Sequence, residues 1–203
     1  MSDSDNITIE RGIPAGQEDA VAALYWDAFG QKLAPALGHR DRGLAFLRAH
    51  LDADRVFCAT RDGQVLGVLG FDEDRRGAIR PTRTGLVRAY SALSAPWRGL
   101  LLAVLARPHR PEEFQLDGIS VAEAARGSGI GSLLIAEAKR EAERRGKRAV
   151  RLSVIDRNPR ARALYERSGF VAAGTSSIGP LSRFFGFRTA TDMVYRMKPE
   201  ERA

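Results

Sequence analysis

Apolar and polar residues alternate along this chain with two different periods, and each change of period predicts another element. Apolar residues at every second position indicate strands, whereas a spacing of three or four positions indicates helices. The first half of the chain predicts, in order, a strand at 7–11, helices at 17–37 and 41–51, and strands at 56–61 and 64–71. Asp62 and Gly63 separate the last two strands, and this dipeptide favours a tight β-hairpin turn.

The second half predicts a longer alternation of helices and strands. Its elements are helices at 84–93 and 97–105, a strand at 114–121, a helix at 128–145, a strand at 149–155, a helix at 159–168, and strands at 170–173 and 193–197. The helix at 128–145 has the clearest amphipathic pattern. Its apolar face is Ile130, Leu133, Leu134, Ala138 and Ala142, and its polar face is Glu137, Arg140, Glu141 and Arg144. The order of elements predicts an α/β (α+β) fold around one sheet.

Composition is typical of a soluble globular protein of one domain. The 203 residues are 44% hydrophobic and 28% charged, close to the average for such proteins. The longest apolar run, from Gly99 to Ala106, is much shorter than the ~20 residues that a membrane span needs. Cys58 is the only cysteine, which excludes an intramolecular disulfide and a cysteine-cluster metal site. We therefore expect a cytoplasmic protein that has no membrane partner.

Charge is distributed unevenly along the chain. The net charge is +7, yet residues 1–74 carry 7 basic and 13 acidic side chains, whereas residues 75–203 carry 25 and 12. A basic half can face nucleic acid, a membrane surface or a polyanionic small molecule. Because 28 of the 32 basic residues are arginines spread thinly along the sequence, we expect no nucleic-acid partner.

A glycine-rich turn between the strand at 114–121 and the helix at 128–145 carries the candidate chemistry. Glycines let the backbone approach a ligand closely and adopt positive φ, and the first amides of a helix bind anions because they have no partner within the helix. Arg126 adds a planar cation suited to phosphate oxygens. The turn therefore predicts a pyrophosphate site made of Arg126, Gly127, Ser128, Gly129, Ile130, Gly131 and Ser132.

Two other phosphate-binding motifs do not match this turn. A nucleotide P-loop needs a lysine followed by serine or threonine, and no lysine lies near the turn. A dinucleotide fingerprint needs a third glycine where this chain has Ser132. What remains is Arg-x-x-Gly-x-Gly, formed by Arg126, Gly129 and Gly131. This pattern resembles the coenzyme A pyrophosphate loop of the GNAT (GCN5-related N-acetyltransferase) superfamily.

The downstream sequence extends this resemblance over residues 114–173. Asn158 precedes a short predicted helix, Tyr165 lies on that helix, and Gly169 and Phe170 close it, as in the acyl-CoA half of the family. Residues before 75 resemble the family only in the order of their elements.

The resemblance implies a GNAT fold in one domain over about 7–198. In that fold a single mixed, largely antiparallel sheet is splayed between its two central parallel strands, and helices flank both faces. The splayed strands would be 116–121 and 150–155. The pantetheine arm of acetyl-CoA would lie between them and bond to the backbone of Ile119 and Val121, on either side of Ser120.

The resemblance also implies roles for two side chains on the downstream helix. Asn158 would contact the cofactor arm, but an asparagine before a helix is also a preferred N-cap, and both roles stay open. Tyr165 would protonate the leaving thiolate, because a phenol still carries its proton at neutral pH and can act as a general acid. The alternative role of Tyr165 is that of a core tyrosine.

Asp117 is the candidate general base, and Glu112 and Glu113 are weaker candidates. Asp117 is two positions before Ile119, so strand alternation places the two side chains on the same face. A carboxylate at a strand edge or turn with no catalytic role is the alternative. Since direct attack by an amine needs neither an acyl-enzyme nor a metal, we expect no metal and interpret Cys58 as a core residue.

These features predict an acetyl-CoA-dependent N-acetyltransferase that moves an acetyl group to a primary amine by direct attack. A non-catalytic acyl-CoA-binding or regulatory module of the same fold is the alternative, and a basic nucleic-acid-binding protein has less support. The acceptor, a small-molecule or peptide amine, would contact 17–51, 79–112 and 174–192. The helical insertion at 79–112 has three open roles: a lid, packing on the sheet, or a homodimer contact.

Overall fold

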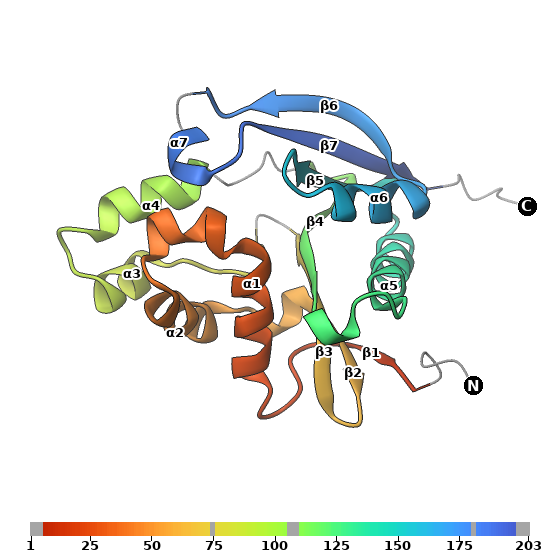
Figure 1. Cartoon of the computed structure of the whole chain (residues 1–203), viewed down its shortest axis with the longest axis horizontal. Coiled ribbons are helices and arrows are strands. Elements are labelled where there is room, and N and C mark those ends of the chain that lie inside the picture. The colour runs from red at the N-terminus through yellow and green to blue at the C-terminus, as the bar shows by residue number, and fades with distance from the viewer. Residues whose placement is uncertain (1–5, 74–75, 105–109, 180–181, 198–203) are drawn as a thin grey trace, which may run out of the picture.

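A seven-stranded sheet forms the centre of the protein (Figure 1). The computed structural model describes residues 6–73, 76–104, 110–179 and 182–197. The strands are β1 (Thr8–Arg11), β2 (Val56–Arg61), β3 (Gln64–Asp72), β4 (Glu113–Val121), β5 (Ala149–Ile155), β6 (Val171–Ser177) and β7 (Thr189–Arg196). Their order in the sheet is β1-β2-β3-β4-β5-β7-β6. Neighbours pair antiparallel except β4 and β5, which are parallel, so the predicted mixed, largely antiparallel sheet is confirmed.

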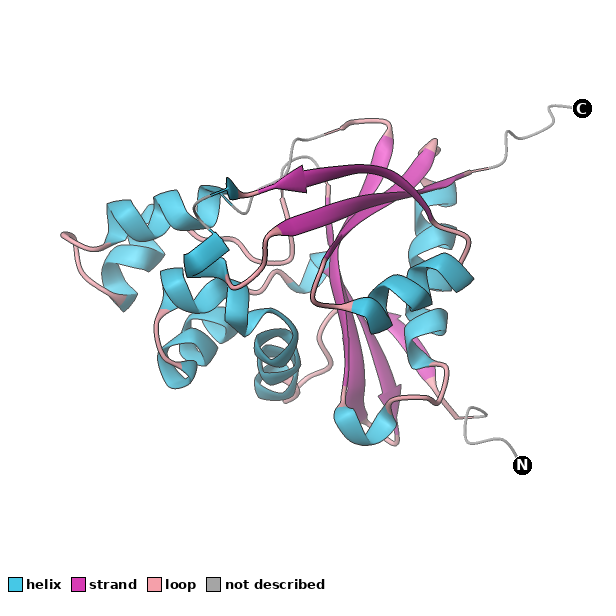
Figure 2. Ribbon diagram, turned by 45° about the horizontal axis from the view of Figure 1, so that its top comes forward, coloured by secondary structure: helices cyan, strands magenta, loops and turns pink. Residues whose placement is uncertain are grey.

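Helices flank both faces of this sheet, as predicted (Figure 2). They are α1 (Glu18–Leu37), α2 (Arg40–His50), α3 (Arg83–Ala89), α4 (Ala95–Val104), α5 (Ile130–Arg144), α6 (Pro159–Arg167) and α7 (Ser182–Phe185), with 3-10 turns η1 (Ala53–Arg55) and η2 (Glu123–Ala125). Of the helices in the described part of the chain, none has the length and hydrophobicity to cross a bilayer.

The hairpin between β2 and β3 has the predicted turn. Asp62 and Gly63 have φ values of 50° and 78°, both in the left-handed region that a type I′ turn requires at its two central positions. The strands pair from Arg61 and Gln64 back to Val56 and Gly70.

Two apolar cores lie on opposite faces of the sheet. The first, which we call the α5 core, joins α5 and α6 to the central strands and includes Ile130, Leu134 and Tyr165. The second, the α1 core, joins α1 and α2 to β2 and β3 and includes Tyr25. Leu133, which the sequence pattern assigns to the apolar face of α5, is exposed.

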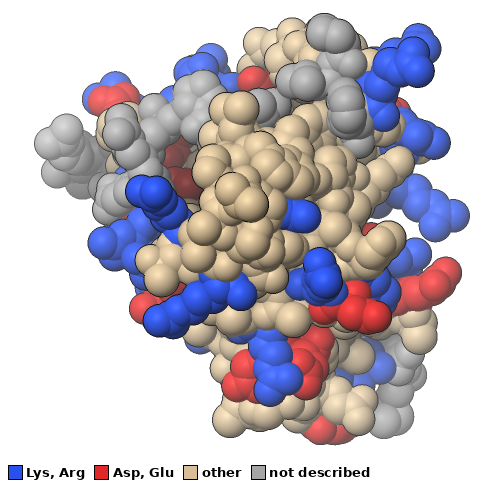
Figure 3. Space-filling view, turned by 90° about the vertical axis from the view of Figure 1, so that its left-hand side faces the viewer, with Lys and Arg blue, Asp and Glu red and all other residues tan. Residues whose placement is uncertain are grey.

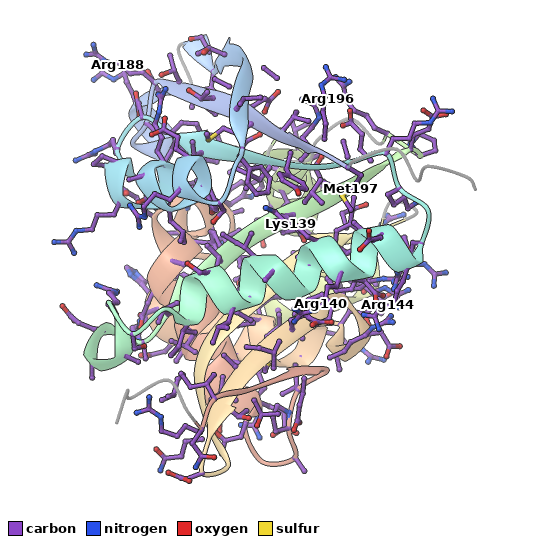
Figure 4. The ribbon with its side chains drawn as sticks, turned by 90° about the vertical axis from the view of Figure 1, so that its right-hand side faces the viewer. Lys139, Arg140, Arg144, Arg188, Arg196 and Met197 are labelled. Carbon is purple, nitrogen blue, oxygen red and sulfur yellow. The ribbon has the colours of Figure 1, made fainter. Side chains whose placement is uncertain are left out.

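The predicted polar face of α5 is wrong at Glu141. Only 5% of this residue is exposed, because the guanidinium groups of Arg145, Arg144 and Arg11 surround its carboxylate. Arg140 and Arg144 follow one edge of α5 (Figure 4), and both are exposed as predicted. Burial of Glu141 depends on a partner from β1, 130 residues away in sequence, which a helical pattern cannot reveal.

Arg145 also joins the C-terminal end of α5 to the end of β3. It binds Glu73, whose carboxylate lies 2.7 Å from a guanidinium nitrogen of Arg55. The guanidinium carbons of Arg55 and Arg145 lie 5.9 and 5.7 Å from the centre of the Phe71 ring. Burial alone would raise the pKa of Glu73, but the hydrogen bond and charge of Arg145, together with the charge of Arg55, outweigh burial and lower that pKa.

The closing segment differs from its prediction. The strand predicted at 170–173 extends to Ser177, the strand predicted at 193–197 begins at Thr189, and α7 lies within the predicted loop at 174–192. Every residue of β6 is exposed, because β6 is an edge strand. An edge strand with both faces in solvent needs no apolar alternation, so the polar sequence after Gly174 gives no strand signal.

The insertion at 79–112 packs on the C-terminal end of α1. The hydroxyl of Tyr90 donates to the carbonyl of Leu37 at 2.7 Å, and Arg98 donates to the carbonyl of Ala36 while its guanidinium lies 4.1 Å from the centre of the Tyr90 ring. The described part of the insertion therefore packs on α1, and its residues 105–109 lie outside the described ranges. The side of the molecule on which α3 and α4 lie in Figure 1 shows an uncharged area edged by Lys and Arg side chains (Figure 3). Leu93, Trp97 and Leu100 of the insertion are exposed.

We predict that Glu73→Gln lowers the free energy of unfolding at neutral pH by about 1–3 kcal/mol, the usual range for hydrogen bonds to charged groups. A carboxylate whose pKa is lower in the folded state stabilises the fold above its unfolded pKa, and this contribution is lost as the pH falls through the folded pKa. The free energy of unfolding measured in urea should therefore be lower for Glu73→Gln than for the wild-type protein at neutral pH, and this difference should shrink in acid. Glu112→Gln, which breaks an exposed pair with Arg148, is the control, and a deficit independent of pH would contradict the role of Glu73.

Candidate functional site

The two central strands separate after a short stretch of pairing. β4 and β5 form only the parallel pairs Glu113–Ala149, Phe114–Val150 and Gln115–Arg151. Beyond them β4 continues to pair with β3 as far as its end, and β5 continues to pair with β7. A gap therefore opens inside the sheet between 116–121 and 152–155, which confirms the predicted splay.

The backbone of β4 directs two amides into this gap. The amide of Ala122 donates to the carbonyl of Leu66 on the β3 side, at 2.8 Å. Because successive amides of an extended strand point to opposite sides, those of Val121 and Ile119 point away from β3, toward the gap. The side chains of Ile119 and Val121 pack against the α5 core, so a core side chain and an open backbone group coexist at both positions.

The glycine-rich turn lies where β4 leads into α5. Gly127 and Gly129 have φ values of 88° and 84°, and an added Cβ at either would meet nothing within 4 Å. The amides of Ile130 and Gly131 open the helix, where no intrahelical acceptor exists. The amide of Ser132 donates to the carbonyl of Gly129 at 2.9 Å, so this member of the predicted set is already engaged within the turn.

Side-chain hydrogen bonds fix the entrance to the turn. The Ser128 hydroxyl donates to the carbonyl of Ala125 at 2.7 Å, and Arg126 Nε donates to the carbonyl of Val121 at 3.3 Å. Arg126 lies 3.8 Å from Glu123, which is 91% exposed, and such surface pairs contribute little energy. The Arg126 guanidinium therefore stands beside the end of β4 without a strong competing partner among the described residues.

Gly131 has a packing role as well as its place in the turn. An added Cβ would lie 2.9 Å from Leu164 on α6 and 3.8 Å from Ile119 on β4. The start of α5, α6 and the open part of β4 thus approach one another at this glycine, a role that sequence reasoning did not separate from anion binding.

The two predicted side chains on α6 have different environments. Tyr165 is 5% exposed and lies in the α5 core, with its ring centre 6.0 Å from that of Phe170. Asn158 is exposed, and its side-chain oxygen accepts the amide of Ala161 at 3.0 Å. The N-cap role of Asn158 is therefore confirmed, while its cofactor contact stays a prediction.

Asp117 does not share a face with Ile119, so the alternation argument is wrong. The register of β3 and β4 shifts between Gly70–Gly118 and Phe71–Leu116, which makes Asp117 the extra residue of a β-bulge. Leu116 and Ile119 both contact the α5 core, whereas the Asp117 carboxylate accepts the amide of Ala78 at 2.9 Å. Ala78 belongs to the α1 core, so Asp117 faces the α1 side of the sheet.

The weaker base candidates are held in ion pairs at the closed end of the gap. Glu113 binds Arg151 through both carboxylate oxygens, and the hydrogen bond to Glu113 raises the pKa of Arg151 against the effect of burial. Glu112 lies 3.0 Å from Arg148.

Cys58 is fully buried in the α1 core. Burial, with a smaller effect from the charge of Glu10, raises the pKa of its thiol to about 12. The thiol is therefore protonated at neutral pH, which agrees with its interpretation as a core residue.

Sequence reasoning missed one polar pair on the other side of the gap. The hydroxyl of Ser153, on β5, donates to the carboxylate of Asp192, on β7. Ser153 is polar within an alternating strand, which is a weak signal, and Asp192 precedes the strand predicted at 193–197, so no pattern pointed to it.

Comparison with known families agrees with this geometry. The family model described as "Acetyltransferase (GNAT) family" matches residues 19–170. The chain belongs to the GNAT acetyltransferase family. No curated protein sequence matches the chain.

Solved structures share the GNAT fold at low sequence identity. An N-acetyltransferase from Staphylococcus aureus Mu50 is 21% identical with a TM-score of 0.59, over 96% of this chain and 100% of that one. The protein yncA from Salmonella typhimurium, solved with its cofactor acetyl-CoA, is 17% identical with a TM-score of 0.58, over 98% of each chain. A ribosomal-protein-alanine N-acetyltransferase from Brucella melitensis is 22% identical with a TM-score of 0.56, over 94% of this chain and 99% of that one.

The residues of this GNAT protein fit acetyl-CoA. The gap offers the backbone amides of Ile119 and Val121, and the turn offers amides at Ile130 and Gly131 beside open space at its glycines. Among the residues that the structure describes, no group of three or more histidine, cysteine, aspartate or glutamate side chains is arranged to hold a metal ion.

We predict that Arg126→Ala weakens acetyl-CoA binding by about 10-fold, the effect of losing one charge-assisted hydrogen bond. Because the contacts of Arg126 within the protein are weak, the melting temperature should not change. Calorimetric titration and thermal unfolding measure the two quantities. Arg140→Ala, which removes an arginine paired with Glu137 on the outer edge of α5, should leave the affinity unchanged, and an equal loss in both variants would contradict a local role.

Proposed function

We propose that the protein catalyses transfer of an acetyl group from acetyl-CoA to a primary amine of a small-molecule or peptide acceptor. The observation that carries this proposal is the gap between β4 and β5, which leads directly to the glycine-rich turn. A linear molecule with a diphosphate at one end and an amide-rich arm matches that combination, because the turn recognises anions and the open strand edges recognise amides.

The backbone around the gap would hold the donor. The amides of Ile119 and Val121 would bond to the pantetheine arm, and those of the turn, with Arg126, would bind the pyrophosphate. Acetyl-CoA supplies an acetyl group that is already activated as a thioester. Whichever of these two β4 amides lies nearer the thioester would, in the transition state, stabilise the charge that develops on the carbonyl oxygen. Fixing both reactants in one place supplies much of the acceleration.

Two side chains would then move protons. Asp117, on the α1 side of the bulge, would accept a proton from the acceptor ammonium, so that the neutral amine attacks the carbonyl carbon. Tyr165, on α6, would donate its proton to the sulfur as the carbon–sulfur bond breaks. As the carbon–sulfur bond breaks, the nitrogen loses its second proton, which restores the phenol of Tyr165, and the proton on Asp117 returns to solvent. The products are then an N-acetyl amine and the free thiol of CoA.

A thiol-release assay with acetyl-CoA and a panel of primary amines tests the reaction class. We expect amine-dependent thiol release from the wild-type protein. Acetyl-CoA binding without thiol release for any amine would instead support the non-catalytic module, and absence of acetyl-CoA binding would refute the whole proposal.

In the same assay, Tyr165→Phe should lower kcat by about 10²-fold or more, the usual contribution of a general acid. The variant keeps the ring that packs in the α5 core, so its affinity for acetyl-CoA and its melting temperature should stay close to wild type. Val171→Ala, an exposed position on β6, is the control, and a Tyr165→Phe enzyme with unchanged kcat would remove Tyr165 from the mechanism.

Asp117→Asn should lower kcat/KM for the amine by about 10²-fold or more without changing acetyl-CoA affinity. The amide oxygen of asparagine can still accept the Ala78 amide, so the bulge should stay intact. Asp27→Asn, at an exposed position on α1 paired with Arg40, is the matched control. If Asp117→Asn retains wild-type kcat/KM, another group accepts the proton.

A further inference from the structure

A polar pair occupies the face of β5 and β7 opposite the α5 core. Leu152 lies opposite Met193 in the β5–β7 register, and both belong to the α5 core. Because alternate residues of a strand face opposite sides, the next pair in that register, Ser153 and Asp192, faces the α1 side. Both residues are partly exposed, and the Ser153 hydroxyl donates to the Asp192 carboxylate.

This pair stands at the mouth of the gap. The last pair between the two central strands is Gln115 with Arg151. Two residues further along each strand are Asp117 on β4 and Ser153 on β5, at the positions where the strands have begun to separate. The α1 side of the gap therefore has Asp117 on one lip and Ser153, with Asp192 behind it, on the other.

Charged side chains of both signs lie on the α1 side of the sheet around the mouth: Glu113, Asp117 and Asp192, with Arg151 on β5 and Lys32 on α1, whose ammonium lies 6.0 Å from the centre of the Phe29 ring. The guanidinium of Arg151 is bound by both oxygens of Glu113. The charge of Asp192 also contributes to the raised pKa of Arg151, which indicates that the two are neighbours. The carboxylate of Asp192, with the hydroxyl of Ser153 bound to it, therefore places a negative charge on the β5 and β7 side of the mouth.

An unsatisfied polar atom lies next to the same mouth. Gln115 Nε2 is buried and has no hydrogen-bond partner in the described part of the chain. Gln115 is paired with Arg151 in the register of the last rung, so it lies on the α1 side immediately before the gap. A buried amide without a partner is costly, which indicates that a ligand or a bound water completes it.

We propose that Asp192, oriented by Ser153, binds the ammonium group of the acceptor and so determines its specificity for cationic primary amines. This inference rests on the proposed function, since it concerns the acceptor side of the same gap. A carboxylate and an ammonium form a charge-assisted hydrogen bond about twice as strong as a neutral one. Asp192 then anchors the nitrogen from the β7 side, while Asp117 on the facing strand takes its proton.

The test measures binding of a simple cation, independently of turnover. n-Butylammonium is titrated by NMR into the wild-type protein saturated with CoA, and n-butanol serves as the uncharged probe of the same length. We expect saturable binding of n-butylammonium that Asp192→Asn weakens by about 10-fold or more, and much weaker binding of n-butanol. Asp27→Asn, an exposed aspartate on α1, should bind the cation as the wild-type protein does.

Ser153→Ala provides a second and milder variant. It leaves the carboxylate in place but removes its hydroxyl donor, so the affinity for n-butylammonium should fall by about 3-fold or more. Restoring the charge with Asp192→Glu should recover part of the loss, which a merely structural role would not allow. If Asp192→Asn is unstable, the affinities of Ser153→Ala and Asp192→Glu for n-butylammonium are compared with that of the wild-type protein instead.

Three outcomes would overturn the inference: no saturable binding of n-butylammonium to the wild-type complex, equal affinity in Asp192→Asn and wild type, or n-butanol binding as tightly as the cation. Acetyl-CoA titration separates this failure from failure of the proposed function. If the protein binds acetyl-CoA and releases thiol with amines, but Asp192→Asn does not change cation binding, the proposed function stands and only the role of Asp192 is refuted.

Discussion

The separation of β4 from β5 after only three residue pairs is the constraint on which the rest of the structure depends. An open edge in the middle of a sheet leaves backbone N–H and C=O groups without partners. A buried backbone group without a partner costs about 1–3 kcal/mol, so a gap several residues long persists only if something fills it. In an acetyltransferase of this fold, a donor with its own amide groups can restore the missing bonds, which supports the proposal that the gap binds acetyl-CoA.

The surrounding structure keeps the gap open at one end and closed at the other. At the closed end, the rings of Phe71 and Phe114 lie 4.9 Å apart, and Arg145 ties α5 to Glu73. At the open end, the bulge at Asp117 bends β4. β4 then passes against α1, where the ring of Phe29 leaves no room for a side chain at position 118, which is glycine. β5 meanwhile stays with β7 along its whole length. Beyond the pair of Gln115 and Arg151, the two strands therefore follow different partners.

Sequence reasoning predicted the donor half of the site because that half is built from neighbouring residues. The turn at 126–132, the helix that follows it and the N-cap of α6 each depend on a few consecutive positions, and glycine, proline and asparagine leave a recognisable pattern there. The acceptor half depends on pairing between distant strands. Asp117 changed face because its register with β3 includes a bulge, and Asp192 was missed because its part of β7 has no apolar alternation. Glu141 is a further example, because one of its partners is Arg11 on β1, which is distant in sequence.

Charged groups on the outer surface and charged groups at the gap differ in how strongly they act. The chain is basic, and the second half strongly so, yet many of its arginines lie on outer surfaces and pair with acidic neighbours, as Arg140 and Arg144 do with Glu137. Such exposed pairs cancel charge locally and add little energy. What a ligand meets at the mouth of the gap is set instead by a few partly buried groups, Asp117, Asp192 and the Glu113–Arg151 pair, in surroundings where charges act more strongly than in water. The net charge of the chain therefore gives no guide to the charge of the acceptor.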